Sequence, residues 1–347
     1  WPAASPSPRR STGNPERSVG AMSSTDVSGK DEVLTDEDPG AARSIGRRLT
    51  PDGLSGMGPM TYLAAERAKL LSRTWEHFDA CMIGGTVGAV LTGIDLAGDL
   101  PDEAIAEVQS ALDAHKVVFF REQHLTQEQH LGFARRFGDL EVHPFIPSTE
   151  DQPELVRFRK GDAAAGYENI WHHDVTWREC PSRSTILRAV QVPEVGGDTL
   201  FADMCSAYDG LSPELKAEVQ DLNAVHTFLR AFGHKVPPGR EQEIRVRYPE
   251  VEHPVVCVHE RTGRRHLYVN RIFVERLADR TREESLDLLD RLCRQADFPE
   301  YQCRFTWEPG SIAFWDNRAV QHYAASDYWP DVRVMERASI VGERPGR

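Results

Sequence analysis

The sequence predicts a mainly β fold with flanking helices, arranged as a sheet sandwich or a jelly roll. Short strand-like runs recur at 184–190, 253–258, 266–270, 303–308, 311–315 and 333–341. Helical segments are few, and they do not alternate regularly with the strands as they would in an α/β fold. Pro309-Gly310 separates two of the runs, and we expect it to form a hairpin turn between them.

Four segments carry helix signals in addition to an apolar face. They begin at a capping residue or a proline, namely at Pro101-Asp102, Thr126, Ser212-Pro213 and Thr281. Gln129 and Glu284 stand three residues after the second and fourth of these starts, which is the spacing of a capping box. Between the first two helices, the apolar run Lys116–Phe120 predicts a buried strand.

Composition divides the 347 residues into a tail and one domain. Residues 1–50 are rich in Ser, Pro, Gly and charge, and such a segment cannot bury enough apolar surface to offset the entropy lost on ordering. We therefore expect a disordered or extended tail over 1–74, with a short helix at 60–73, and a domain over 75–347. Within that domain, residues 229–252 contain Pro237-Pro238-Gly239 and many charges, which predicts a long loop and a candidate lid.

The charge of the chain excludes several classes of partner. The formal net charge is −13; residues 1–74 carry +1 and the remainder −14. Such a chain repels nucleic acid and anionic membranes, and no apolar run is long enough to span a bilayer. The six cysteines form no CxxC pair, which favours a reducing, cytoplasmic location. The oligomeric state is left open, a homo-oligomer included.

One constellation could hold a metal ion. His172 and Asp174 would project from the same face of a strand, and a third candidate, His322, lies far downstream. Two imidazoles and one carboxylate make the facial triad typical of non-haem iron(II), which leaves coordination positions open for oxygen chemistry. His-x-Asp alone is a weak signal, because His77-Phe78-Asp79 also contains it.

Two arginines follow the last candidate ligand. Arg333 and Arg337 share one face of the run 333–341. Two guanidinium groups in a buried strand are costly unless anions lie against them. The spacing therefore predicts that a site for small anions accompanies the metal site.

The sequence resembles the TauD/TfdA family of iron(II)- and 2-oxoglutarate-dependent dioxygenases. The resemblance covers about residues 75–343 and is carried by WHHDVTW (171–177), GGDTLF (196–201), HPVV (253–256), FWDNRAVQH (314–322) and RVMER (333–337). It implies the double-stranded β-helix, a form of jelly roll.

The resemblance also implies a set of site residues. The iron ligands would be His172, Asp174 and His322, and Thr199 with Arg333 would hold the distal carboxylate of 2-oxoglutarate. Substrate would contact residues of a pocket that the resemblance assigns to His143, Ile146, Phe232, Phe273 and Arg337. The cofactors implied are iron(II), 2-oxoglutarate as cosubstrate, and O₂.

Two departures from the pattern of taurine-specific members bear on the substrate. Ile146 replaces a tyrosine of those members, and Glu168 replaces an asparagine. Losing a hydroxyl and gaining a negative charge both disfavour taurine as the substrate. A larger, more apolar anion fits better, as in the alkylsulfatase and phenoxyalkanoate branches of the family.

The leading hypothesis is a dioxygenase that hydroxylates a small anionic substrate, such as a sulfonate, an alkyl sulfate or an aryloxyalkanoate, and releases succinate and CO₂. Three alternatives stay open. They are a biosynthetic hydroxylase of the same kind, a zinc hydrolase using the same three ligands, and a jelly-roll binding protein without catalysis.

Overall fold

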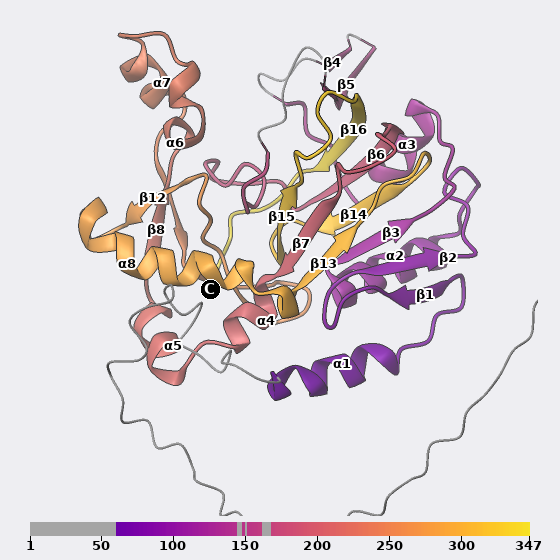
Figure 1. Cartoon of the computed structure of the whole chain (residues 1–347), viewed down its shortest axis with the longest axis horizontal. Coiled ribbons are helices and arrows are strands. Elements are labelled where there is room, and N and C mark those ends of the chain that lie inside the picture. Colours follow the sequence, from indigo (N-terminus) through magenta and orange to yellow (C-terminus); the bar gives the residue numbers. More distant parts are fainter. Residues whose placement is uncertain (1–59, 144–147, 150, 162–167) are drawn as a thin grey trace, which may run out of the picture. The chain divides into compact units, whose positions relative to one another are not determined.

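The structure, a computed structural model, describes residues 60–143, 148–149, 151–161 and 168–347 (Figure 1). These residues form a mainly β fold with helices packed outside the sheets, as the sequence predicts. The predicted tail lies outside the described part from residue 1 to residue 59, and so does Ile146.

An eight-stranded sheet, here called the major sheet, is the largest element. Its strands in spatial order are β1 (Asp79–Met82), β2 (Ala89–Thr92), β3 (Val117–Phe120), β14 (Ile312–Asp316), β6 (Ser184–Gln191), β16 (Arg333–Ile340), β5 (Gln152–Lys160) and β4 (Ser148–Thr149). Neighbouring strands are antiparallel, apart from the parallel pair β2 and β3.

A three-stranded antiparallel sheet, here called the minor sheet, consists of β13 (Gln302–Phe305), β7 (Thr199–Asp203) and β15 (Val320–Ala324). A second three-stranded sheet contains β12 (Val274–Leu277), β8 (Asn223–His226) and β9 (Val251–Pro254). The strands β10 (Val256–Val258) and β11 (Arg265–Leu267) form a separate antiparallel pair.

The major sheet is covered on both faces, and the side-chain alternation of β3 shows how. Val118 and Phe120 belong to a core cluster that includes Phe133 of a covering helix. Phe119 points to the other face and stacks on Phe305 of the minor sheet, with ring centroids 4.0 Å apart. Because successive strand residues face opposite sides, one apolar run fills two cores.

The α-helices are α1 (Ala64–Leu71), α2 (Asp102–His115), α3 (Gln127–Arg135), α4 (Met204–Asp209), α5 (Pro213–Val219), α6 (Phe228–Phe232), α7 (Glu241–Arg247) and α8 (Arg282–Cys293). Short 3₁₀ helices occur at Thr61–Leu63, Gly233–Lys235, Arg294–Asp297 and Pro299–Tyr301. Both predicted capping boxes, at the starts of α3 and α8, are present with reciprocal hydrogen bonds. In the described part of the chain, no helix could cross a membrane.

The prediction of a hairpin at Pro309-Gly310 is wrong, although a turn is present there. The amide of Ser311 donates to the carbonyl of Glu308 at 3.0 Å, and Gly310 has a φ of 76°. However, β13 pairs with β7 in the minor sheet, whereas β14 pairs with β3 and β6 in the major sheet. A turn that passes from one sheet to the facing sheet uses the same residues as a hairpin turn, so the sequence signal cannot separate them.

Two further segments differ in detail from the predictions. The segment 229–252, predicted as a loop, contains most of α6, the 3₁₀ turn Gly233–Lys235 and α7 (Figure 1). The helix expected at 60–73 is present, and it packs against the domain, since Arg264 donates to Glu66 at 2.8 Å. The packed part of the chain therefore begins N-terminal of the expected start near residue 75.

Two fully buried histidines couple the stability of this fold to pH. Burial, then the charge of Lys116, lowers the pKa of His115 to about 4. Burial, then the charge of Arg188, lowers the pKa of His130 to about 4. In the unfolded chain both would titrate near 6.5. The unfolded state therefore binds more protons than the folded state between about pH 6.5 and 4.

We expect the free energy of unfolding to fall as the pH is lowered from about 6.5 to 4, because protonation of buried imidazoles favours unfolding. His130 alone should contribute a change of about 3 kcal/mol over this range. The free energy of unfolding can be measured with denaturant at several pH values. Its slope against pH should be smaller for His130→Gln than for the wild-type protein. The exposed His234→Gln should keep the wild-type slope. An unchanged slope in His130→Gln would contradict this account.

Candidate metal centre and active site

The candidate metal centre is built on a pairing between two distant segments. The amide of His172 donates to the carbonyl of His322 at 3.1 Å, and the amide of His322 donates back to His172 at 2.9 Å. This isolated antiparallel bridge attaches residue 172 to β15. The segment is not the regular strand that the sequence predicts, because the chain turns directly afterwards at Val175, whose φ is 49°.

The bridge and the turn bring the three predicted ligands together. The Nε2 atoms of His172 and His322 each lie 3.9 Å from a different carboxylate oxygen of Asp174. One donor atom from each of the three residues lies within 4.8 Å of the others, and all three side chains are buried. The structure therefore brings together the three residues that the sequence singles out as candidate ligands, although the local backbone is a bridge and a turn and not the predicted strand.

Hydrogen bonds and neighbouring charges favour cation binding by the side chains of His172, Asp174 and His322. The Nδ1 of His172 donates to the carbonyl of Ile170 at 2.7 Å, so its Nε2 carries the free lone pair. Burial would raise the pKa of Asp174, but Arg337 and the neighbouring imidazoles lower it to about 2. Burial lowers the pKa of His322 to about 3. Two imidazoles and one carboxylate form a donor set that suits divalent transition metals.

Asn317 holds the backbone of Asp174 in place, a role that no local sequence signal predicts. The side-chain oxygen of Asn317 accepts from the amide of Asp174 at 2.7 Å. Its Nδ2 donates to the carbonyls of Asp174, at 3.0 Å, and of Ser182, at 2.9 Å. The side-chain amide of Asn317 therefore makes the hydrogen bonds to the Asp174 backbone that a neighbouring strand would make in a sheet.

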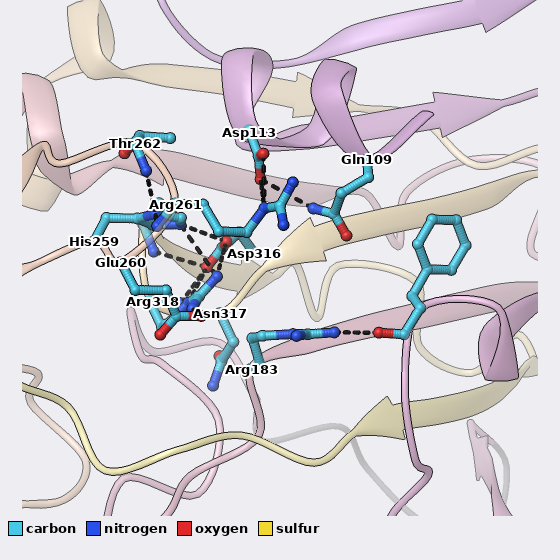
Figure 2. A network of polar contacts seen from close by, with 12 residues as sticks. Gln109, Asp113, Arg183, His259, Glu260, Arg261, Thr262, Asp316, Asn317 and Arg318 are labelled. Atoms are coloured by element: carbon cyan, nitrogen blue, oxygen red, sulfur yellow. Dashed lines mark hydrogen bonds and ion pairs between the residues drawn. The ribbon is translucent and has the colours of Figure 1, made fainter. Parts of the chain in front are cut away.

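A charged network fixes the turn that carries Asn317 (Figure 2). The buried carboxylate of Asp316 accepts from Arg318 at 2.7 Å and from His259 at 2.8 Å. Arg318 also pairs with Glu260. Although burial would raise the pKa of Asp316, Arg318 and then His259 hold it well below its usual range. The turn between β14 and β15 is thus anchored on both sides of Asn317.

The second predicted group, Arg333 and Thr199, also comes together. Arg333 lies on β16 and Thr199 on β7, and the Nη2 of the arginine donates to the hydroxyl at 3.4 Å. Among the described residues, the Nε of Arg333 has no hydrogen-bond acceptor. Burial lowers the pKa of Arg333. A buried guanidinium with a spare donor is what a carboxylate ligand requires.

Arg337 and His143 lie near Asp174, one of the candidate metal ligands. The Nη1 of Arg337 lies 3.3 Å from Asp174 Oδ1, and its Nε has no acceptor among the described residues. Burial, then the charges of Arg337 and Arg178, lowers the pKa of His143 to about 3. At neutral pH His143 is therefore an uncharged hydrogen-bonding group beside a permanently charged one.

The two predicted pocket aromatics belong to one aromatic cluster: Phe232 lies on the α6–α7 segment (228–247), and Phe273 directly precedes β12. Phe273 packs with Val175, Trp177 and Phe228, and Phe232 borders this group. The ring centroids of Phe232 and Phe273 lie 6.2 Å apart. The cluster therefore rests directly on the turn that follows Asp174. Glu168, the other departure noted above, pairs with Lys160 at 3.0 Å.

Comparisons with known proteins show which family this chain resembles. Residues 82–339 match the family model described as taurine catabolism dioxygenase TauD, TfdA family. An alpha-ketoglutarate-dependent sulfate ester dioxygenase of Pseudomonas putida is 36% identical, over 78% of this chain and 91% of the relative. An alkylsulfatase of Acinetobacter baylyi is 34% identical, over 75% of this chain and 83% of the relative.

A solved structure shares the fold as well as the sequence. The crystal structure of a taurine dioxygenase from Burkholderia xenovorans is 37% identical and superposes with a TM-score of 0.68. The match covers 78% of this chain and 91% of that chain. The chain therefore belongs to the TauD/TfdA family of dioxygenases, as the resemblance predicts.

Proposed function

We propose that the protein is an iron(II)- and 2-oxoglutarate-dependent dioxygenase that hydroxylates a small anionic organic substrate. The observation that carries this proposal is the buried convergence of His172, Asp174 and His322. Three protein ligands on one side of a divalent metal leave positions for a chelating cosubstrate and for O₂. Iron(II), 2-oxoglutarate and O₂ together supply the oxidising power for C–H hydroxylation and yield succinate and CO₂.

We infer that the major and minor sheets form a double-stranded β-helix. The two sheets face each other across a shared core, in which Phe119 and Phe305 stack, and β13 passes directly into β14 of the other sheet. Such crossovers are expected of a jelly roll. In this arrangement the proposed ligands come from β15 and its bridged partner.

We assign binding of the cosubstrate's distal carboxylate to the buried guanidinium of Arg333. Arg333 has a spare Nε donor and no described carboxylate within ion-pair distance, and Thr199 lies beside it. A zinc hydrolase would need the three metal ligands but would have no use for a buried arginine and threonine. This pair therefore favours a dicarboxylate cosubstrate that reaches from the metal to Arg333.

We assign the anionic group of the substrate to Arg337 and His143. A fixed guanidinium with a spare Nε beside a neutral imidazole can hold a sulfate, sulfonate or carboxylate near the metal. The aromatic cluster with Phe232 and Phe273 would contact the organic part of the substrate, and the α6–α7 segment would close over it as a lid. Ile146, which lies outside the described residues, remains a proposed pocket residue. Among the expected substrates, an alkyl sulfate agrees best with the relatives from Pseudomonas and Acinetobacter.

Succinate release from the cosubstrate tests the activity directly. Under air with iron(II), an anionic substrate should stimulate release, and alkyl sulfates, alkylsulfonates and phenoxyalkanoates form the panel. His322→Ala should abolish release, because it removes a proposed ligand. Arg337→Gln should weaken the apparent affinity for the anionic substrate about tenfold and leave the apparent affinity for the cosubstrate unchanged. Product formation without O₂ or 2-oxoglutarate would instead support the hydrolase.

Metal affinity tests the role of Asn317. Asn317→Ala should weaken binding of iron(II) or cobalt(II) by roughly 10–100-fold, because the backbone of Asp174 loses its partners. Anaerobic titration calorimetry measures this affinity without any turnover. The exposed Asn169→Ala, three residues before His172, is the matched control and should bind as the wild-type protein does. Equal affinity in Asn317→Ala would show that Asp174 needs no such support.

A further inference from the structure

Trp307 contacts both members of the Arg333–Thr199 pair, and it lies outside all the sequence motifs that carry the family resemblance. It follows β13, and only 5% of its surface is exposed. Its indole Nε1 donates to the hydroxyl of Thr199 at 2.9 Å. The Cζ of Arg333 lies over its ring, 5.6 Å from the ring centroid. One side chain therefore touches the two groups proposed to bind the distal carboxylate.

The hydrogen-bond roles at Thr199 follow from this contact. A threonine hydroxyl has one hydrogen to donate and two lone pairs with which to accept. An indole N–H and a guanidinium N–H can only donate. Because Trp307 and Arg333 both donate to this hydroxyl, at 2.9 Å and 3.4 Å, its accepting capacity is used. The hydroxyl hydrogen of Thr199 is left to donate to whatever anion approaches Arg333.

The ring of Trp307 also helps Arg333 to remain charged while buried. The electron-rich face of an indole attracts a cation, and the attraction grows when water is excluded. A carboxylate at the same place would stabilise the arginine too, but it would neutralise the charge that a ligand needs. Among the described residues, no carboxylate forms an ion pair with Arg333. The aromatic face thus supports the cation and leaves its charge available.

We propose that Trp307 is a positioning residue for the cosubstrate. It fixes the hydroxyl of Thr199 as a donor and supports Arg333, so that the distal carboxylate of 2-oxoglutarate meets two aligned donors. This inference rests on the proposed function. The alternative is that Trp307 serves only in packing, because its ring also packs against Phe305, with 5.1 Å between the ring centroids.

Anaerobic binding to the iron(II)-loaded protein separates the two roles. Trp307→Phe should weaken binding of 2-oxoglutarate roughly tenfold, because it removes the N–H and part of the ring. Oxalate chelates the metal but has no distal carboxylate, so its affinity should stay within about twofold of wild type. In a Thr199→Val background, Trp307→Phe should have a much smaller effect, because the hydroxyl that it orients is already absent. Phe305→Leu, a packing change in the same cluster, should leave both affinities unchanged.

A second variant covers the case in which Trp307→Phe fails to fold. Replacing Trp307 by 3-benzothienylalanine keeps the shape and the ring face and removes only the N–H. It should still weaken binding of 2-oxoglutarate. Wild-type affinity in this variant, or an equal loss for 2-oxoglutarate and oxalate, would overturn the positioning role. If the wild-type protein itself did not bind 2-oxoglutarate, the proposed function would fail, and this result is distinguishable from the others.

Discussion

The backbone pairing between His172 and His322 is the interaction on which the site depends. Each of its two hydrogen bonds is worth only about 1 kcal/mol. The pairing is supported because the neighbouring rings of Trp171 and Tyr323 pack 5.5 Å apart and Asn317 holds the next turn. Two imidazoles thereby become adjacent, with ring centroids 4.2 Å apart, although most of the domain separates them in sequence. The proximity of the candidate ligands is a consequence of β pairing, so a change that breaks the pairing should also disturb the proposed metal site.

Charge is distributed in a way that suits small anions and excludes large ones. The chain carries a net −13, yet on β16 the buried Arg333 lies beside Thr199 and the partly buried Arg337 lies beside Asp174. Arg337 lies against Asp174, whereas Arg333 contacts the Thr199 hydroxyl and the ring of Trp307 and forms no ion pair among the described residues. An acidic surface repels polyanions over long range, but the two guanidinium groups of Arg333 and Arg337 act over a few ångströms. This difference in range explains how an acidic protein can use anionic ligands.

Much of the fold was predictable from the sequence, since capping boxes and apolar runs are local signals. The proposed ligand set was predictable because its three residues lie within sequence motifs that resemble those of a known family. Two failures share one cause: Pro309-Gly310 connects facing sheets rather than a hairpin, and the turn at Val175 replaces a strand. Which strand a segment pairs with is decided by distant residues. Asn317 and Trp307 were missed for the same reason, because their partners, Asp174 and Thr199, lie more than one hundred positions away.

The most direct test of the central claim is optical titration of the metal-loaded protein without oxygen. A 2-oxoglutarate that chelates iron(II) at His172, Asp174 and His322 should produce a visible charge-transfer band, saturating as the site fills. Glutarate, which lacks the keto oxygen, should produce none. We expect this band in the wild-type protein and its loss in His322→Ala. Iron(II) bound at the site with no band at saturating 2-oxoglutarate would contradict the claim.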